Sequence, residues 1–416
     1  ISKTLTHAGA SLKPAFMGNS CDMFALIPGN FHLAHTTSVS TASISSAFCV
    51  PQMESAGLPT SLNSINLYKT IEGTPFRFSP DKPVDGAELN TILPFDNPCN
   101  GLVFGGVGSG KTVFLLNHLL HSLYQNSKIP CVFLDSKKGG YIFTKHVGGS
   151  YLNTTGFKLN PFEFLDANNI GKITNFLLIL SGMKSDDRDF KISIEEALKT
   201  TLKNKNISPS DFIRLLPQEH RDKLHEFTSS DIFSGSGLGN KFPLSIDFDE
   251  ILDGSPELSA GLMYLIITAL EKYEGKKIVV IDELPRYLAN KTIAEFFADA
   301  LKQLRKTGVS IISATNDVTV LENPYIRSAC MNFNFFLLFP GITITDELIE
   351  LVGLNDNQIF FLNQSGSEKR LALYVNGKHS SIIDLNIKYY GSYTNIFSSS
   401  HQNISKYQSD PNNYIS

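Results

Sequence analysis

Eight consecutive residues constrain this chain more than any other part of its sequence. They fit the pattern G-x-x-x-x-G-K-[ST] and are Gly105, Gly106, Val107, Gly108, Ser109, Gly110, Lys111 and Thr112. A short apolar run, residues 101–104, precedes them, and a strongly apolar stretch, residues 113–123, follows. Because glycine has no Cβ, such a loop can turn its backbone N–H groups inward toward a phosphate. The sequence therefore predicts a strand, a phosphate-binding loop and a helix, in that order.

This loop predicts a site for ATP and Mg²⁺. We expect Lys111 to reach the β- and γ-phosphates and the Thr112 hydroxyl to bind Mg²⁺. The N-terminus of the following helix, which includes Val113, adds a favourable partial positive charge. The predicted nucleotide-binding residues are therefore the eight loop residues and Val113. The alternative, a glycine-rich turn without a ligand, is disfavoured by the flanking strand and helix.

A second predicted strand ends in two acids. Residues 278–281 are four apolar β-branched residues, and Asp282 and Glu283 follow them. We expect Asp282 to hold the hydration shell of Mg²⁺ and Glu283 to polarise the attacking water. Since an apolar run ending in acids also occurs where a strand simply leaves the core, this assignment depends on its pairing with the phosphate loop.

Two further catalytic candidates follow these acids. Residues 309–313 form another short apolar run, and Asn316 lies just beyond it, where a polar side chain would face the γ-phosphate. Alternatively, Asn316 is an ordinary loop residue without a catalytic role. Arg305 lies in the last turn of a helix predicted over residues 292–306. It either complements the helix dipole or reaches a neighbouring subunit as an arginine finger.

The alternation of strands with helices predicts an α/β fold with a parallel-rich sheet. Between about residues 166 and 270 the strand pattern disappears, which predicts an inserted all-α subdomain. We expect an ATPase domain over residues 86–390. Residues 1–85 would be the remnant of an N-terminal β-containing domain or a connecting β segment. Residues 391–416 form a polar tail that is either disordered or a docking arm.

Composition narrows the class of protein. The net charge of −4 argues against a surface built mainly for nucleic acid, and the small cluster of Lys137, Lys138 and Lys145 is typical of a solvated face. The sequence contains no run of about 18 apolar residues, so it predicts no transmembrane helix. The five cysteines lack C-x-x-C spacing, which suits a reduced setting without zinc or disulfides. Because the first residue is Ile1, we expect the numbering to begin inside a longer natural chain.

Several segments, in this order, resemble the large conserved ATPase of type IV secretion and conjugation systems, the TrbE/CagE type. The resemblance covers most of the chain. The combination of the phosphate loop with residues 159–162 and with the helix end at residues 301–306 is fairly specific. Besides the phosphate loop, the matching segments are residues 25–30 (like "LPGN"), 100–104, 133–140 (like "D-x-D-x-G"), 159–162 ("LNPF"), 301–306 ("LK-x-x-RK"), 352–354 and 380–385.

This resemblance implies a RecA-like P-loop motor domain with a helical insertion. It also implies hexamers, or dimers that stack into them, bound peripherally to the cytoplasmic face of a bacterial inner membrane beside other secretion-system subunits. ATP turnover would drive assembly of the channel or pilus, or passage of substrate. The chain departs from the family at Lys137, where the family has a second Asp. It also departs at Leu284 and Pro285, where the family prefers Ala-Trp after the two acids, and at Asn316, where the family has Gln.

Two alternative functions stay open at this stage. One is a DNA pump, such as a coupling protein or a HerA/FtsK-like translocase, which needs basic loops along a central pore. Nucleic acid is therefore a possible partner that the charge does not indicate. The other is a scaffold that binds nucleotide with little turnover. A steep salt dependence of DNA affinity would favour the pump.

Overall fold

The computed structural model describes the chain in ten stretches. All of them lie in the second of the chain's two units, Ser55–Ser416. They are residues 66–71, 75–78, 100–182, 187–202, 207–235, 241–288, 291–364, 370–377, 379–411 and 413–414. The predicted match at residues 25–30, like most of residues 1–85, falls outside these stretches.

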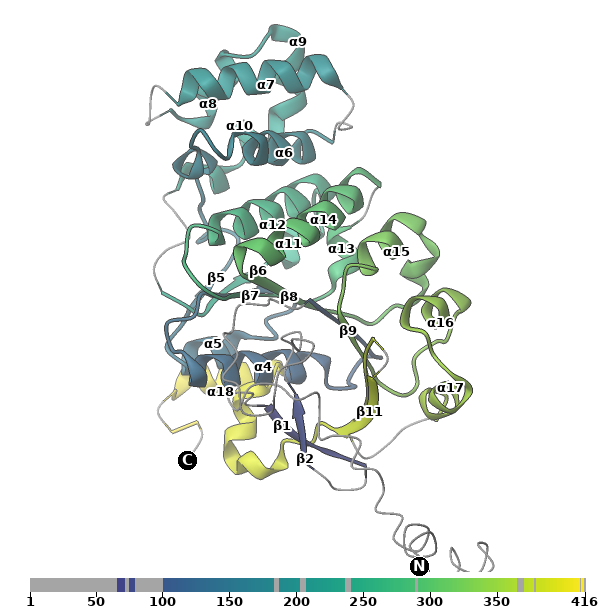
Figure 1. The fold of residues 1–416 in the computed structure, drawn as a ribbon. Coiled ribbons are helices and arrows are strands. Elements are labelled where there is room, and N and C mark those ends of the chain that lie inside the picture. Colours follow the sequence, from purple (N-terminus) through teal and green to yellow (C-terminus); the bar gives the residue numbers. More distant parts are fainter. Residues whose placement is uncertain are drawn as a thin grey trace, which may run out of the picture. The chain divides into compact units, whose positions relative to one another are not determined.

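One sheet runs through the described residues in the order β2-β1-β11-β10-β9-β3-β8-β7-β4-β6-β5 (Figure 1). The strands from β9 to β5 are parallel, and β10, β11, β1 and β2 extend the β9 edge in antiparallel pairs. The sheet is thus α/β and parallel-rich, as predicted. The strands are β1 (Asn66–Thr70), β2 (Pro75–Phe78), β3 (Gly101–Phe104), β4 (Cys131–Asp135), β5 (Ser150–Leu152), β6 (Leu244–Asp247), β7 (Lys277–Ile281), β8 (Val309–Thr315), β9 (Phe335–Leu338), β10 (Leu371–Asn376) and β11 (His379–Asp384).

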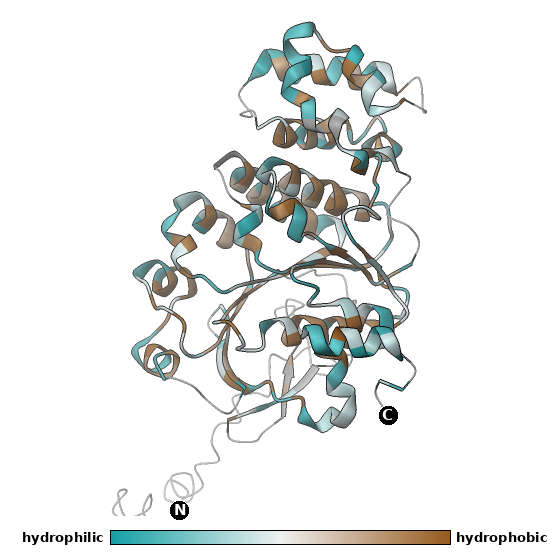
Figure 2. Ribbon diagram, turned by 180° about the vertical axis from the view of Figure 1, so that it is seen from behind, coloured by the Kyte–Doolittle hydropathy of each residue, from teal (hydrophilic) through white to brown (hydrophobic). Residues whose placement is uncertain are grey.

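The parallel strands are continuous apolar runs because helices cover both of their faces. Successive side chains point to opposite faces, so Leu102 of β3 packs in one core cluster and Val103 in the other. In β7, Val279 and Val280 divide in the same way. Figure 2 shows these strands, and the helix faces turned toward them, in the brown of hydrophobic residues.

Helices cover the two faces of the sheet (Figure 1). The cluster that contains Val103 and Val280 also contains residues of α4 and α5, and the cluster that contains Leu102 and Val279 contains residues of α12 and α14. Ser255 caps α12 by accepting a hydrogen bond from the Leu258 N–H. These helices and their short neighbours are α4 (Lys111–Gln125), α5 (Tyr141–His146), α11 (Asp249–Leu252), α12 (Pro256–Leu270), α13 (Leu284–Tyr287), α14 (Lys291–Leu304) and η5 (Arg305–Thr307).

The predicted helical insertion packs around phenylalanines that are continuous with the core on the α12 face of the sheet. Phe176, Phe212, Phe227 and Phe233 are all fully buried there, with ring centroids 5.1–6.2 Å apart in the contacting pairs. The insertion joins the sheet domain where α6 packs against α12. Its elements are η2 (Pro161–Phe164), α6 (Ile170–Leu180), α7 (Arg188–Thr201), α8 (Pro209–Arg214), α9 (Gln218–Arg221), η3 (Asp222–Leu224), α10 (His225–Ser229) and η4 (Asp231–Ser234).

The prediction that no strand occurs between residues 166 and 270 is wrong. Strand β6 lies within that range and inserts between β4 and β5 in the sheet. Its four residues include Ser245 and Asp247, so it lacks the apolar run by which the other strands were identified. Helix α12 also lies within that range, and it covers the sheet rather than the insertion core alone.

The structure refines the expectations for the two ends of the chain, residues 1–85 and 391–416. Strands β1 and β2 belong to the main sheet, which favours a connecting segment over a separate domain for this part of residues 1–85. The polar tail contains a regular helix, α18, whose Ile404 and Tyr407 pack with Ile142 of α5. Disorder is therefore the wrong alternative for residues 391–411. The elements of this region are η6 (Thr319–Glu322), α15 (Pro324–Cys330), α16 (Asp346–Val352), α17 (Asp356–Leu362), η7 (Lys388–Phe397) and α18 (His401–Ser409).

Candidate nucleotide-binding site

The predicted phosphate loop connects β3 to the N-terminus of α4, as the sequence requires. Gly108 and Gly110 have φ values of 78° and 110°, in the left-handed region that side-chain-bearing residues disfavour. At Gly105 an added Cβ would lie 2.5 Å from the Ser109 hydroxyl oxygen. Glycine is therefore required at three positions of the loop by backbone conformation or by space. Val107, at the loop's tip, is 92% exposed.

Lys111 points back into this loop. Its ammonium donates hydrogen bonds to the carbonyls of Gly105, at 2.7 Å, and Gly106, at 3.0 Å. Burial lowers the pKa of Lys111, and the charges of Glu283 and Asp282 oppose that shift. The loop thus holds a buried cation whose charge interacts with the two acids at the end of β7.

Asp282 lies on the α4 face of the sheet, the same side as Val280. The Thr112 side chain lies close enough to its carboxylate to favour the charged form of Asp282. Burial raises the pKa of Asp282 to about 6, with Glu283 adding to the rise and Lys111 opposing it. Hydroxyl and carboxylate oxygens are the donors that Mg²⁺ prefers, so Thr112 and Asp282 fit the predicted Mg²⁺ site.

Glu283 occupies an uncommon backbone conformation. Its φ and ψ are 58° and 47°, in the left-handed region, directly before α13. A non-glycine residue in this region costs free energy that the surrounding structure must offset, and such residues cluster at functional sites. The side chain is half-buried, as a base that must meet both protein and water would be. Lys137 and Lys138, which follow β4, share the left-handed conformation.

The two weaker catalytic candidates occupy different positions. Asn316 directly follows β8, which lies between the strand that leads to the loop and the strand that leads to Asp282. Its side chain is exposed at the edge where those strands end. Arg305 is the first residue of η5, and its side chain lies outside what the structure describes. The roles of both residues stay predictions.

A buried acid that the sequence analysis did not assign lies beside Asp282. Asp135 ends β4, where Leu134 pairs with Ile281, and one of its oxygens accepts hydrogen bonds from the Gly140 N–H (2.9 Å) and the Tyr151 hydroxyl (2.8 Å). Its side chain is fully buried, and burial raises its pKa to about 8. The match of residues 133–140 to "D-x-D-x-G" includes this acid and was the available signal, but it was given no role.

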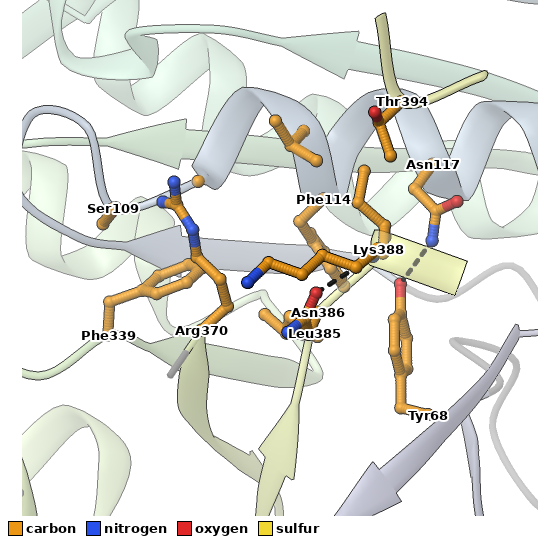
Figure 3. A pocket seen from close by; sticks show the side chains of 13 residues that line it. Tyr68, Ser109, Phe114, Asn117, Phe339, Arg370, Leu385, Asn386, Lys388 and Thr394 are labelled. Atoms are coloured by element: carbon orange, nitrogen blue, oxygen red, sulfur yellow. Dashed lines mark hydrogen bonds between the residues drawn. The ribbon is translucent and has the colours of Figure 1, made fainter. Parts of the chain in front are cut away.

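A pocket of about 370 Å³ opens on the other flank of α4, beside the loop (Figure 3). Its walls come from β1, the start of α4, the ends of β9 and β11, and η7. The lining residues are Tyr68, Ser109, Gly110, Val113, Phe114, Asn117, Phe339, Arg370, Leu385, Asn386, Ile387, Lys388 and Thr394. Three of them, Ser109, Gly110 and Val113, are predicted nucleotide-binding residues, so the pocket continues the phosphate site.

Arg370 joins this pocket to the phosphate loop and was also missed from sequence. Its guanidinium donates a hydrogen bond to the Gly108 carbonyl at 2.7 Å. A Cβ added at Gly110 would lie 3.3 Å from the same guanidinium nitrogen. A lone arginine 262 residues along the chain from Gly108 forms no motif, so its position depends on the folded sheet.

Comparisons with known proteins agree with the predicted resemblance. Over 99% of its length the chain is 23% identical to the type IV secretion system protein VirB4 of Bartonella henselae, and over 78% it is 25% identical to CagE of Helicobacter pylori. It spans 55% and 38% of those two proteins, respectively. No family model matches the chain.

Solved structures extend this agreement to the fold. VirB4 of Thermoanaerobacter pseudethanolicus aligns with a TM-score of 0.64 at 16% identity, covering 80% of this chain and 99% of that one. The plasmid coupling protein TrwB, solved with ADP and Mg²⁺, aligns with a TM-score of 0.51 at 14% identity, covering 75% and 89%. The predicted RecA-like P-loop fold is confirmed.

Proposed function

Because this chain is a divergent relative of the type IV secretion system proteins VirB4 and CagE, we propose that it is an ATP-hydrolysing motor of such a system. The observation that carries the proposal is the position of Lys111. Its ammonium lies in the phosphate loop, within the electrostatic reach of Asp282 and Glu283. Turnover would energise assembly of the channel or pilus and the transfer of substrate.

Each residue of the site has a distinct role in the proposed hydrolysis of ATP. Bound ATP and Mg²⁺ supply the transferable phosphoryl group and the neutralising charge. Lys111 would exchange its loop carbonyls for the β- and γ-phosphate oxygens, and Thr112 and Asp282 would hold Mg²⁺ and its water shell. Glu283 accepts a proton from the attacking water at its carboxylate. Asn316, at the end of the intervening strand, orients the γ-phosphate side of the site.

We place the base and ribose of the nucleotide in the pocket beside α4. Its volume of about 370 Å³ lies within the range of about 300–1,000 Å³ that is typical of small-molecule sites. Phe114 and Leu385 are buried apolar walls for the base. The Tyr68 hydroxyl accepts a hydrogen bond from the Asn117 amide at 3.0 Å, which leaves its own proton to donate toward a ligand.

The assembly follows from the same proposal. A ring of subunits, a hexamer or dimers of it, would let Arg305 reach the site of its neighbour as an arginine finger. Such an arginine supplies about 10³–10⁵ in rate. Partners would be other secretion-system subunits, with the motor bound peripherally at the cytoplasmic face of the inner membrane. Among the described residues, no helix has the length and apolar character needed to span a membrane.

The test is ATP hydrolysis measured against protein concentration. An oligomeric motor with a trans arginine predicts a specific rate that rises steeply with concentration and is lost in Lys111→Ala and Arg305→Ala. Arg214→Ala is the matched control, because Arg214 is an exposed arginine of the insertion paired with Asp211. No turnover at any concentration, with Mg-ATP bound, would replace the motor by a nucleotide-binding scaffold. A normal rate in Arg305→Ala alone would remove only the finger.

A further inference from the structure

The pocket beside the phosphate loop is positively charged. Of its lining residues, Arg370 and Lys388 are cations, and none is Asp or Glu. Among the described residues, Arg370 makes one polar contact, with the Gly108 carbonyl, and has no acidic partner. The Arg370 side chain is exposed and lines the pocket, and a guanidinium carries five N–H donors, so most of its donors have no partner among the described residues. In Figure 3 the Arg370 side chain extends toward Ser109, and the Lys388 side chain extends across the pocket toward Arg370.

The position of Arg370 decides which part of a nucleotide it can meet. Thr112, Asp282 and Glu283 lie on the β7 flank of the loop, where the γ-phosphate and its water must react. Arg370 lies on the opposite flank, at the junction of Ser109 and Gly110 with the pocket. A nucleotide whose nucleoside occupies the pocket must pass its α-phosphate through this junction. The arginine therefore faces the phosphate nearest the nucleoside.

We infer that Arg370 is a positioning residue that binds the α-phosphate of the nucleotide within its own subunit, with Lys388 as the second cation of the junction. This inference rests on the proposed function and assigns a residue to it. In the free protein the guanidinium is held by the Gly108 carbonyl, which keeps it aligned with the loop. On binding, its free N–H groups donate to phosphate oxygens in the forked geometry for which arginine is suited.

The experiment is isothermal titration calorimetry with ADP and with a non-hydrolysable ATP analogue. Hydrogen bonds to charged groups contribute about 1.5–3 kcal/mol, so Arg370→Ala should bind both nucleotides roughly 10- to 100-fold more weakly, by the same factor. Arg370→Lys should fall between the wild type and Arg370→Ala, because lysine keeps the charge but loses the fork. In steady-state hydrolysis, KM should rise by more than kcat falls. Arg214→Ala should bind as the wild type does.

Three results would overturn the assignment. Unchanged affinity for both nucleotides would leave the Gly108 contact a purely structural one. A loss confined to the ATP analogue would move the arginine to the γ-phosphate. A fall in kcat without a rise in KM would give it the role of a finger. Thermal melting checks that the variants fold, and Arg370→Lys carries the test if Arg370→Ala does not. Failure of the wild type to bind either nucleotide would instead refute the proposed function.

Discussion

The two flanks of the α4 N-terminus differ in the residue types that line them and in the strands that supply those residues. On the β7 flank, buried acids end neighbouring parallel strands: Asp282 on β7 and Asp135 on β4. On the pocket flank, the cations Arg370 and Lys388 and the ring of Tyr68 come from the antiparallel strands, their ends and the C-terminal segment. In the function we propose, the first flank carries the chemistry and the second flank holds the nucleotide.

The sheet topology explains this division. The carboxyl ends of parallel strands meet at one edge, so acids that follow different strands converge there. The β10–β11 hairpin reverses direction, which brings Arg370, just before β10, against Leu385, just after β11, with a backbone hydrogen bond of 2.8 Å. Two residues fifteen positions apart thus share a pocket wall that parallel strands would not provide.

The largest expected effect tests the acidic flank. Glu283→Gln keeps the size of the side chain but removes the base, so the hydrolysis rate should fall by about 10²–10⁴ while ADP affinity stays within a factor of about two. Glu196→Gln, on the exposed face of α7, is the control. Equal losses of rate and affinity would contradict the division between the flanks, as would a rate that does not change.

A smaller effect tests the pocket flank. Thr394 is half-buried at the pocket's edge, so Thr394→Trp should fill part of the volume and weaken ADP binding by about tenfold. Inorganic triphosphate lacks a nucleoside, so its affinity should not change. Calorimetry measures both ligands, and Thr200→Trp on the exposed face of α7 serves as control. Equal weakening of both ligands would place the nucleoside elsewhere.

The smallest effect concerns the pH dependence of folding stability that the buried acid Asp135 causes. Burial raises the pKa of Asp135 to about 8, so the folded state binds more protons than the unfolded state between pH 4 and 8. Stability should therefore fall as pH rises through that window. In Asp135→Asn the amide oxygen can still accept from Gly140 and Tyr151, and this loss should shrink. Melting temperatures at pH 5 and pH 8 measure it, and an unchanged pH dependence would mean that Asp135 does not titrate there.

Sequence reasoning reached the β7 flank because its residues are local in the chain. Lys111 and Thr112 lie in one motif, and Asp282 follows an apolar run that identifies its strand. Strand β6 was missed because its four residues lack such a run, and helix α18 because only Ile404 and Tyr407 anchor it. The pocket flank was missed because Tyr68, Arg370 and Thr394 share no spacing and meet only through sheet pairing and the C-terminal fold.

Calorimetric titration of ADP into wild type and Lys111→Ala, each with and without Mg²⁺, tests the nucleotide site most directly. A nucleotide held between the two flanks predicts saturable binding by the wild type that Mg²⁺ strengthens through Thr112 and Asp282. It also predicts a loss of roughly 10- to 100-fold in Lys111→Ala, from the missing charged contact. Equal affinity of the two proteins, with or without Mg²⁺, would contradict a nucleotide site at this loop.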